Sequence, residues 1–102
     1  MTPHGNSYKN TKPHHLYVIF DKQEDDIYKY GISHDPIEAD GLSARFRDQL
    51  DLYNRIAGWQ RFYAEILQYD IAGRLKARQI EQQLIRDYKV LYGRRPMGNL
   101  SD

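Results

Sequence analysis

The chain contains no cysteine, which excludes a disulfide framework and a thiolate metal site. It has no apolar run near the roughly 20 residues of a membrane-spanning helix, and its N-terminus is too polar for a signal peptide. It also has no excess of one charge, and a net charge of +1 does not by itself indicate a nucleic-acid partner. With 102 residues and 40% hydrophobic content, it is expected to form one domain with a modest core.

The chain is instead rich in tyrosine, and its charges are unevenly distributed. Nine tyrosines can cover half-buried surface while keeping their hydroxyl groups available. Acidic residues cluster in 21–26 and 35–40, whereas arginine and lysine dominate the rest. This distribution allows a basic face for a polyanion, although arginines scattered over solvated helices are the commoner explanation.

A β-hairpin is predicted near the N-terminus. Segments 15–20 and 27–33 are rich in aromatic and β-branched residues, which favours two strands. The residues between them are typical of a turn. We expect residues 1–13 to form an N-terminal arm and residues 14–102 to form the folded domain.

The next two elements are predicted from periodicity. Apolar residues recur at helical spacing over 42–56, and Gly58 ends that run, which indicates a helix. Alternation of apolar and polar residues over 61–69 indicates a third strand. Residues 35–41 between hairpin and helix are expected to form a loop.

A second helix is predicted over 72–91, with Asp70 as its candidate cap and Gly93 as its end. The tail over 94–99 is expected to form a turn. The resulting order, β-β-α-β-α, predicts a small α+β domain, with a central three-stranded antiparallel sheet flanked by helices.

Glu81 is unusual because it falls within the apolar stripe of the second predicted helix, between Ala77 and Leu84. A carboxylate that faces a core must be paired, protonated or bound to a metal. The alternative is a glutamate at the edge of the stripe, paired with Arg78 or Lys76.

Arg45 is the second candidate, because it borders the apolar side of the first predicted helix three residues after Leu42 and four before Gln49. An arginine between a sheet and a helix can clamp a phosphate through two hydrogen bonds and stabilise developing charge. The alternative is a surface arginine whose stem covers apolar neighbours.

The hairpin supplies the third group of candidates. Strand alternation puts Lys29 and Gly31 on one face of the second strand, opposite Tyr28 and Tyr30, while Tyr17 lies on the first strand. A phenol or an amine near a metal and an arginine can have its pKa lowered and then accept a proton from water. Strand tyrosines are, however, more often packing residues.

The histidines do not add a metal site. His14, His15 and His34 lack a convincing metal-ligand spacing. We expect the first two to be loop or strand-edge residues.

Taken together, these residues resemble the GIY-YIG (URI) endonuclease family. The first motif corresponds to His15-Leu16-Tyr17, and the second to Lys29-Tyr30-Gly31. The family's helical arginine matches Arg45, its metal-binding glutamate matches Glu81, and its late asparagine matches Asn99. The order of elements also agrees, so that the resemblance covers nearly the whole chain.

The chain departs from the family pattern at three places. The first motif retains Tyr17 but neither its glycine nor its isoleucine. Lys29 replaces the tyrosine of the second motif, as in some restriction-type members, and could serve as general base if its pKa is depressed. Gln49 stands where many members have histidine, which shifts the role of base to Tyr17 and Lys29.

A narrower resemblance is to the C-terminal nuclease toxin domains of bacterial polymorphic toxins. The segments that carry it are 4–7, 11–13, 29–33, 71–74 and 96–99. It implies that a larger secreted bacterial toxin delivers the domain into the cytoplasm of a target cell, without a signal in this chain. It also implies a cognate immunity protein as partner.

The resemblance implies a metal-dependent endonuclease that hydrolyses the phosphodiester bonds of nucleic acid. DNA is the first choice of substrate, and RNA stays open as the alternative. Glu81 would hold one divalent cation, Mg²⁺ in the first place and Mn²⁺ as the alternative. Arg45 would bind a phosphate oxygen, and Tyr17, alone or with Lys29, would deprotonate water. The residues expected to bind substrate or shape the site are Tyr30, Gln49, Arg78 and Asn99.

Two other functions stay open at this point. A nucleic-acid-binding module of the same fold that has lost catalysis would explain Lys29 and Gln49 as degeneration. A small structural α+β domain would instead require Arg45 and Glu81 to be exposed and far apart.

Overall fold

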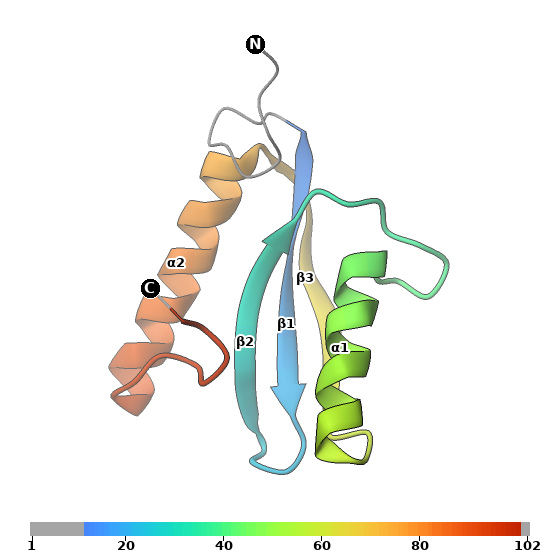
Figure 1. The fold of residues 1–102 in the computed structure, drawn as a ribbon. Helices are drawn as coiled ribbons and strands as arrows, with labels where there is room; N and C mark the ends of the chain where they lie inside the picture. The colour runs from blue at the N-terminus through green and yellow to red at the C-terminus, as the bar shows by residue number, and fades with distance from the viewer. Residues whose placement is uncertain (1–11, 101–102) are drawn as a thin grey trace.

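The predicted element order is confirmed in the computed structural model, which describes residues 12–100 (Figure 1). The five elements are β1 (Pro13–Asp21), β2 (Asp26–Ser33), α1 (Ala44–Ala57), β3 (Phe62–Ala72) and α2 (Arg74–Tyr92). The three strands form one antiparallel sheet in the order β2-β1-β3, so the α+β class is confirmed. Each predicted strand and helix is present, with ends that differ by at most three residues.

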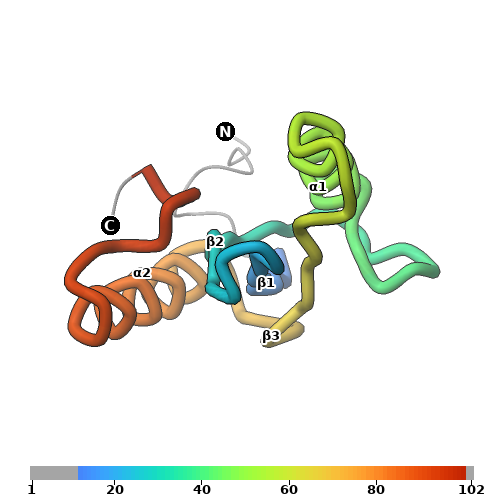
Figure 2. Tube along the Cα trace, turned by 90° about the horizontal axis from the view of Figure 1, so that it is seen from below, coloured from blue at the N-terminus to red at the C-terminus, as the bar shows by residue number. Residues whose placement is uncertain are grey.

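The two helices cover opposite faces of the sheet (Figure 2). Side chains alternate between faces along a strand, so β1 contributes to two separate cores. Tyr17 and Ile19 pack against Phe46 of α1, whereas Val18 packs against Ile85 of α2. Burial of each such side chain contributes about 1.5–3 kcal/mol, and both helices are thereby held against the central strand.

A β-bulge in β2 interrupts the regular alternation of the hairpin. Lys29 pairs with Ile19, and Ile27 pairs with Phe20, so Tyr28 is an extra residue on β2. Tyr28 packs with the α1-side core rather than on the face opposite Lys29. The predicted opposition of Tyr28 and Lys29 is therefore wrong, because strict alternation does not hold across a bulge.

The capping residues of α1 explain why it begins two residues later than predicted. The Ser43 hydroxyl oxygen accepts a hydrogen bond from the Phe46 N–H at 3.4 Å, which makes Ser43 the N-cap and Ala44 the first helical residue. Gly58, at φ 82°, ends the helix and donates its N–H to the Asn54 carbonyl.

The assignment of Asp70 as the cap of α2 is wrong. Asp70 lies within β3 at φ 53°, and the strand continues to Ala72 because Ile71 and Ala72 pair with the start of β1. The N-cap of α2 is Gly73, which offers no side chain for capping. Neither α1 nor α2, which are the helices of the described part of the chain, is long and apolar enough to cross a membrane.

The start of the domain also differs from its prediction. The predicted arm, 1–13, falls mostly outside the described residues, but Pro13 already belongs to β1. His14 and His15 are buried in this central strand, with exposed fractions of 1% and 4%, so their assignment to a loop or strand edge is wrong. His14 pairs with β3 and His15 pairs with β2, and their rings pack against His34 and Phe46, respectively.

Candidate active site

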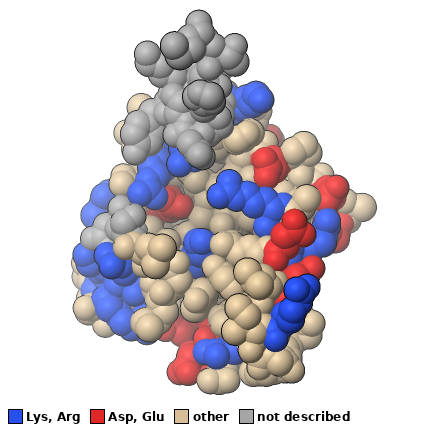
Figure 3. All heavy atoms as spheres, viewed as in Figure 1, with Lys and Arg blue, Asp and Glu red and all other residues tan. Residues whose placement is uncertain are grey.

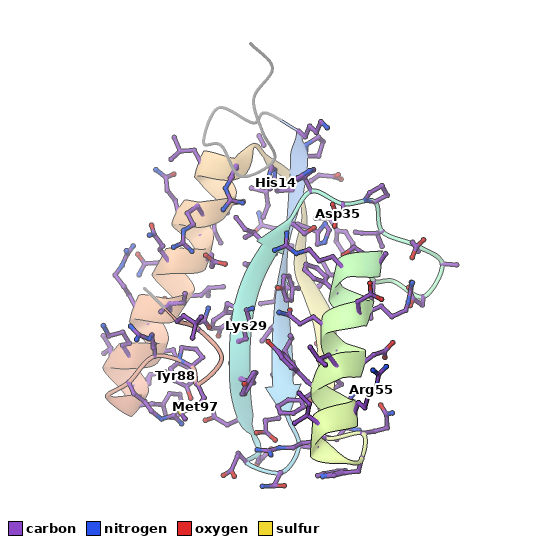
Figure 4. The ribbon with its side chains drawn as sticks, in the orientation of Figure 1. His14, Lys29, Asp35, Arg55, Tyr88 and Met97 are labelled. Carbon is purple, nitrogen blue, oxygen red and sulfur yellow. The ribbon has the colours of Figure 1, made fainter. Side chains whose placement is uncertain are left out.

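A cavity of about 570 Å³ lies beside β2, where residues from all elements except β3 meet the C-terminal segment 94–100. All eight site residues predicted from the sequence line it: Tyr17, Lys29, Tyr30, Arg45, Gln49, Arg78, Glu81 and Asn99. The fold thus brings together side chains that are distant in the sequence. Figure 4 shows Lys29 on β2, between α2 and α1.

Tyr17 stands on β1 at the base of the cavity, with only 5% of its surface exposed. Its hydroxyl donates a hydrogen bond to Gln49 Oε1 at 3.3 Å. Gly31 lies directly opposite on β2, and a Cβ at that position would overlap the Tyr17 ring. Burial raises the pKa of Tyr17 well above its usual value, more than the Arg45 guanidinium lowers it. The phenol is therefore a hydrogen-bond donor at neutral pH.

Lys29 lies on β2 two residues before Gly31, the residue that pairs with Tyr17. Burial lowers the pKa of Lys29, the Arg45 guanidinium lowers it further, and the Glu81 carboxylate acts in the opposite direction. Its ammonium therefore loses a proton more readily than that of an exposed lysine. Of the two candidate bases, Lys29 has the pKa shift that suits a proton acceptor.

Glu81 supplies a buried carboxylate from α2, with 5% of its surface exposed. It forms an ion pair with Arg78 one helical turn earlier. Burial raises the pKa of Glu81, while Arg78, Arg74 and Lys29 lower it. The predicted pairing with Arg78 is present, but Glu81 lies inside the apolar stripe between Ala77 and Ile85 rather than at its edge.

Arg45 projects from the first turn of α1 and is exposed. It lines the same cavity as Gln49, one turn further along the helix, and as Glu81 of the opposite helix. Arg47, in contrast, forms ion pairs of 2.8 Å with Glu38 and with Asp40 outside the cavity. A purely structural domain would require Arg45 and Glu81 to be exposed and far apart. Instead, both residues line one cavity and Glu81 is buried.

The C-terminal segment closes the free edge of β2. The Asn99 side chain accepts a hydrogen bond from the Tyr30 N–H and donates one to the Tyr30 carbonyl, both at 3.0 Å. The Gly98 N–H donates to the Tyr28 carbonyl at 2.7 Å. The Tyr30 ring itself packs with Val18 and Ile85 on the α2 side of the sheet. Asn99 and Tyr30 therefore shape the wall of the cavity through main-chain contacts.

Carboxylate groups for a metal are few. Among residues 12–100, no cluster of three or more His, Asp or Glu side chains is placed to hold a metal ion. Glu81 is a single carboxylate beside a polar cavity. This donor set fits a cation that keeps most of its water shell and completes it with phosphate oxygens, as Mg²⁺ does.

Of the lining residues that the sequence-based predictions missed, three carry a hydroxyl group or a charge on their side chains. Tyr28 and Tyr53 form part of the wall on the α1 side, where their rings contact each other edge to face. Arg74 lines the wall on the α2 side. Its position could have been recognised, because it precedes Arg78 by four residues and Glu81 by seven and so shares their face of the helix.

Comparison with known proteins places the chain in a family. The family model of URI fold toxin 2 (Tox-URI2) matches residues 7–93, which is most of the chain. No curated protein and no solved structure matches the chain. The matched span contains Tyr17, Lys29, Arg45 and Glu81. The predicted resemblance to URI-fold toxin domains is therefore confirmed at this level, and the chain belongs to the URI fold toxin 2 family.

Proposed function

We propose that this toxin domain is a GIY-YIG-type endonuclease that hydrolyses phosphodiester bonds, in DNA rather than RNA. The observation that carries the proposal is the convergence of Tyr17, Lys29, Arg45 and Glu81 on one polar cavity. These groups comprise a phenol, an amine with lowered pKa, a guanidinium and a buried carboxylate. Together they can bind an anionic phosphate, hold a cation and accept a proton.

Arg45 and Glu81 would act on the phosphate from opposite sides of the cavity. The exposed Arg45 guanidinium can approach a non-bridging oxygen with two parallel hydrogen bonds and balance the charge that develops in the transition state. Glu81 would hold one divalent cation, Mg²⁺ or Mn²⁺. When bound, this cation supplies Lewis-acid neutralisation of the phosphate and of the leaving oxygen.

Lys29 and Tyr17 would handle the attacking water. Because burial and Arg45 lower the pKa of Lys29, Lys29 is the preferred proton acceptor of the two. The Tyr17 hydroxyl, whose pKa is raised, would position the water by hydrogen bonding, and Gln49 would orient that hydroxyl. Gln49 does not titrate, so it contributes geometry rather than proton transfer.

The test is cleavage of supercoiled plasmid DNA, and of RNA for comparison, in the presence of Mg²⁺. We expect Glu81→Ala and Arg45→Ala each to lower the nicking rate by at least about 100-fold, the usual cost of removing one group that stabilises transition-state charge. Arg55→Ala is the matched control, since this exposed arginine of α1 points away from the cavity in Figure 4 and should leave the rate unchanged.

Retained cleavage in either site variant, with circular dichroism that shows a folded protein, would refute the assignment. A protein that shifts the mobility of DNA but leaves it intact would indicate the alternative, a binding module without catalysis.

The family's description as a toxin supports a role in competition between bacteria. We propose that a larger secreted protein delivers the domain into the cytoplasm of a target cell and that a cognate immunity protein protects the producer. Expression of the domain inside bacteria should therefore arrest growth. The Glu81→Ala variant should not, because toxicity would depend on cleavage.

A further inference from the structure

The cavity has more positive charge than one phosphodiester needs. In the described part of the chain, the side chains of Lys29, Arg45, Arg74 and Arg78 line it together with one carboxylate, that of Glu81. A phosphodiester carries a single negative charge. Figure 3 shows that Lys and Arg side chains gather over α2 on this face of the molecule.

The proposed mechanism uses neither Arg74 nor Arg78, but Arg78 is already paired with Glu81. Arg74 is the first residue of α2 and lines the cavity. Its Nε is shielded from solvent and has no hydrogen-bond partner among residues 12–100. A shielded N–H without an acceptor is uncommon and costs free energy, and it shows that no hydrogen bond within the described residues fixes this nitrogen. A phosphate oxygen would supply the acceptor once the guanidinium turns towards the cavity that Arg74 lines. Arg61, by comparison, is paired with Asp21 at 2.7 Å.

The position of Arg74 separates it from the phosphate that would be cleaved. With a rise of about 1.5 Å per residue, Arg74 lies roughly 6 Å along the α2 axis from Arg78 and roughly 10 Å from Glu81. Side chains on a helix all lean towards its N-terminus, so the side chains of Arg74 and Glu81 stay separated in the same way as their backbone positions. A phosphate in contact with Arg74 is therefore a neighbour of the one at Glu81.

We propose that Arg74 binds the phosphate adjacent to the scissile one, so that the site takes a nucleic-acid strand by two successive phosphates. The inference rests on the proposed nuclease function and extends it. Arg74 is then a substrate-binding residue that sets the minimum length of substrate. Its influence on the cation site is the positive charge that lowers the pKa of Glu81, and Arg74→Lys retains that charge.

The test is binding of a dye-labelled 20-nucleotide single strand and of the matching duplex in EDTA, measured by fluorescence anisotropy over a series of salt concentrations. The logarithm of the binding constant K falls linearly with the logarithm of the salt concentration. Loss of one phosphate contact reduces the magnitude of this slope by about 0.7 for a single strand and about 0.9 for a duplex. We expect this change for Arg74→Ala. Arg74→Lys should largely retain the slope, because it keeps the charge.

Arg86→Ala is the matched control. Arg86 is also an arginine of α2, but it is exposed, bonds to Gln83 and lies outside the cavity. Its removal changes the total charge equally and should leave the slope unchanged. In cleavage assays with Mg²⁺, Arg74→Ala should raise KM several-fold and leave kcat nearly unchanged.

The outcomes separate this inference from the function on which it rests. An unchanged salt slope in Arg74→Ala, or a loss of kcat with unchanged KM, overturns the adjacent-phosphate site while leaving the nuclease intact. An equal change in Arg86→Ala overturns it too, since only overall charge would then matter. If the unaltered protein neither binds nor cleaves either nucleic acid, both proposals fail together.

Discussion

At the scale of single residues, the site depends on the close approach of Tyr17 and Gly31. The Tyr17 ring lies against the position where a Cβ of residue 31 would stand, and it packs on Phe46 from α1. The glycine therefore gives room to the phenol, whose hydroxyl is held by Gln49. This explains why a glycine occurs inside a strand, where it otherwise weakens the backbone by about 0.5–1 kcal/mol.

We expect Gly31→Ala to lower the free energy of unfolding by about 1–3 kcal/mol, because the added methyl group overfills a packed site. The measurement is urea unfolding. In a Tyr17→Ala background the same substitution should be neutral or stabilising, since the ring that it meets is gone. An equal cost of Gly31→Ala in both backgrounds would show that the ring contact is not its cause.

Candidate site residues with a distinctive local sequence pattern could be predicted from the sequence, and the others could not. Glu81 interrupts an apolar stripe, and Arg45 borders one, so each could be identified on its helix. The side on which Tyr28 packs depends on a bulge, which appears only in the pairing of β1 with β2. The unpartnered Nε of Arg74 likewise depends on tertiary packing, which sequence spacing does not report.

At the scale of elements, the C-terminal segment substitutes for a fourth strand. β2 is an edge strand, and its outer N–H and C=O groups need partners or water. The Asn99 amide meets both groups of Tyr30, as a paired backbone would, and Gly98 meets the Tyr28 carbonyl. The segment thus blocks this part of the edge and completes the cavity wall.

Asn99→Ala should lower the free energy of unfolding by about 1–2 kcal/mol, because it removes two partly buried hydrogen bonds and leaves the Tyr30 backbone groups without these partners. Hydrogen exchange of the Tyr30 amide should become faster in the same variant. Leu100→Ala is the control, since Leu100 is 90% exposed and should change neither measurement. Unaltered exchange at Tyr30 in Asn99→Ala would contradict the role of the segment as an edge cover.

The order of the elements was predictable because helical periodicity and strand alternation are local signals. Their ends were less predictable. The end of β3 is set by pairing with β1, which extends the strand past Asp70 and moves the helix start to Arg74. The docking of residues 98–99 against β2 involves hydrogen bonds across the fold, and a turn-like composition does not reveal them.

At the scale of the whole molecule, the sheet holds two histidines in its interior. His14 and His15 stand near the start of the central strand, and the Nε2 atom of each lacks a hydrogen-bond partner among residues 12–100. Burial lowers the pKa of both. His34 and Arg74 add to the shift at His14, where the Lys12 carbonyl opposes it, and Asp35 opposes the shift at His15. The folded protein therefore favours their neutral forms.

This burial predicts a loss of stability in mildly acidic solution. Below a pH of about 6.5, His14 and His15 become protonated in the unfolded chain. In the folded chain their lowered pKa values keep them neutral to a lower pH. Since the unfolded state then binds more protons, the free energy of unfolding falls as the pH decreases from 7.5 to 5.5. Asp21, whose pKa is lowered by Arg61, contributes only near and below pH 4. Urea unfolding at several pH values measures the slope.

A double variant, His14→Asn with His15→Phe, isolates the contribution of these two side chains. Asparagine can still donate a hydrogen bond to the Lys12 carbonyl, and phenylalanine can keep the edge-to-face contact that His15 makes with Phe46. The raised pKa of Glu81 acts in the opposite direction, because burial penalises its charged form as the pH rises, and it is unchanged in the variant. The variant should therefore lose less stability than the natural chain between pH 7.5 and 5.5. Equal slopes in the two proteins would show that the buried histidines do not control the response to acid.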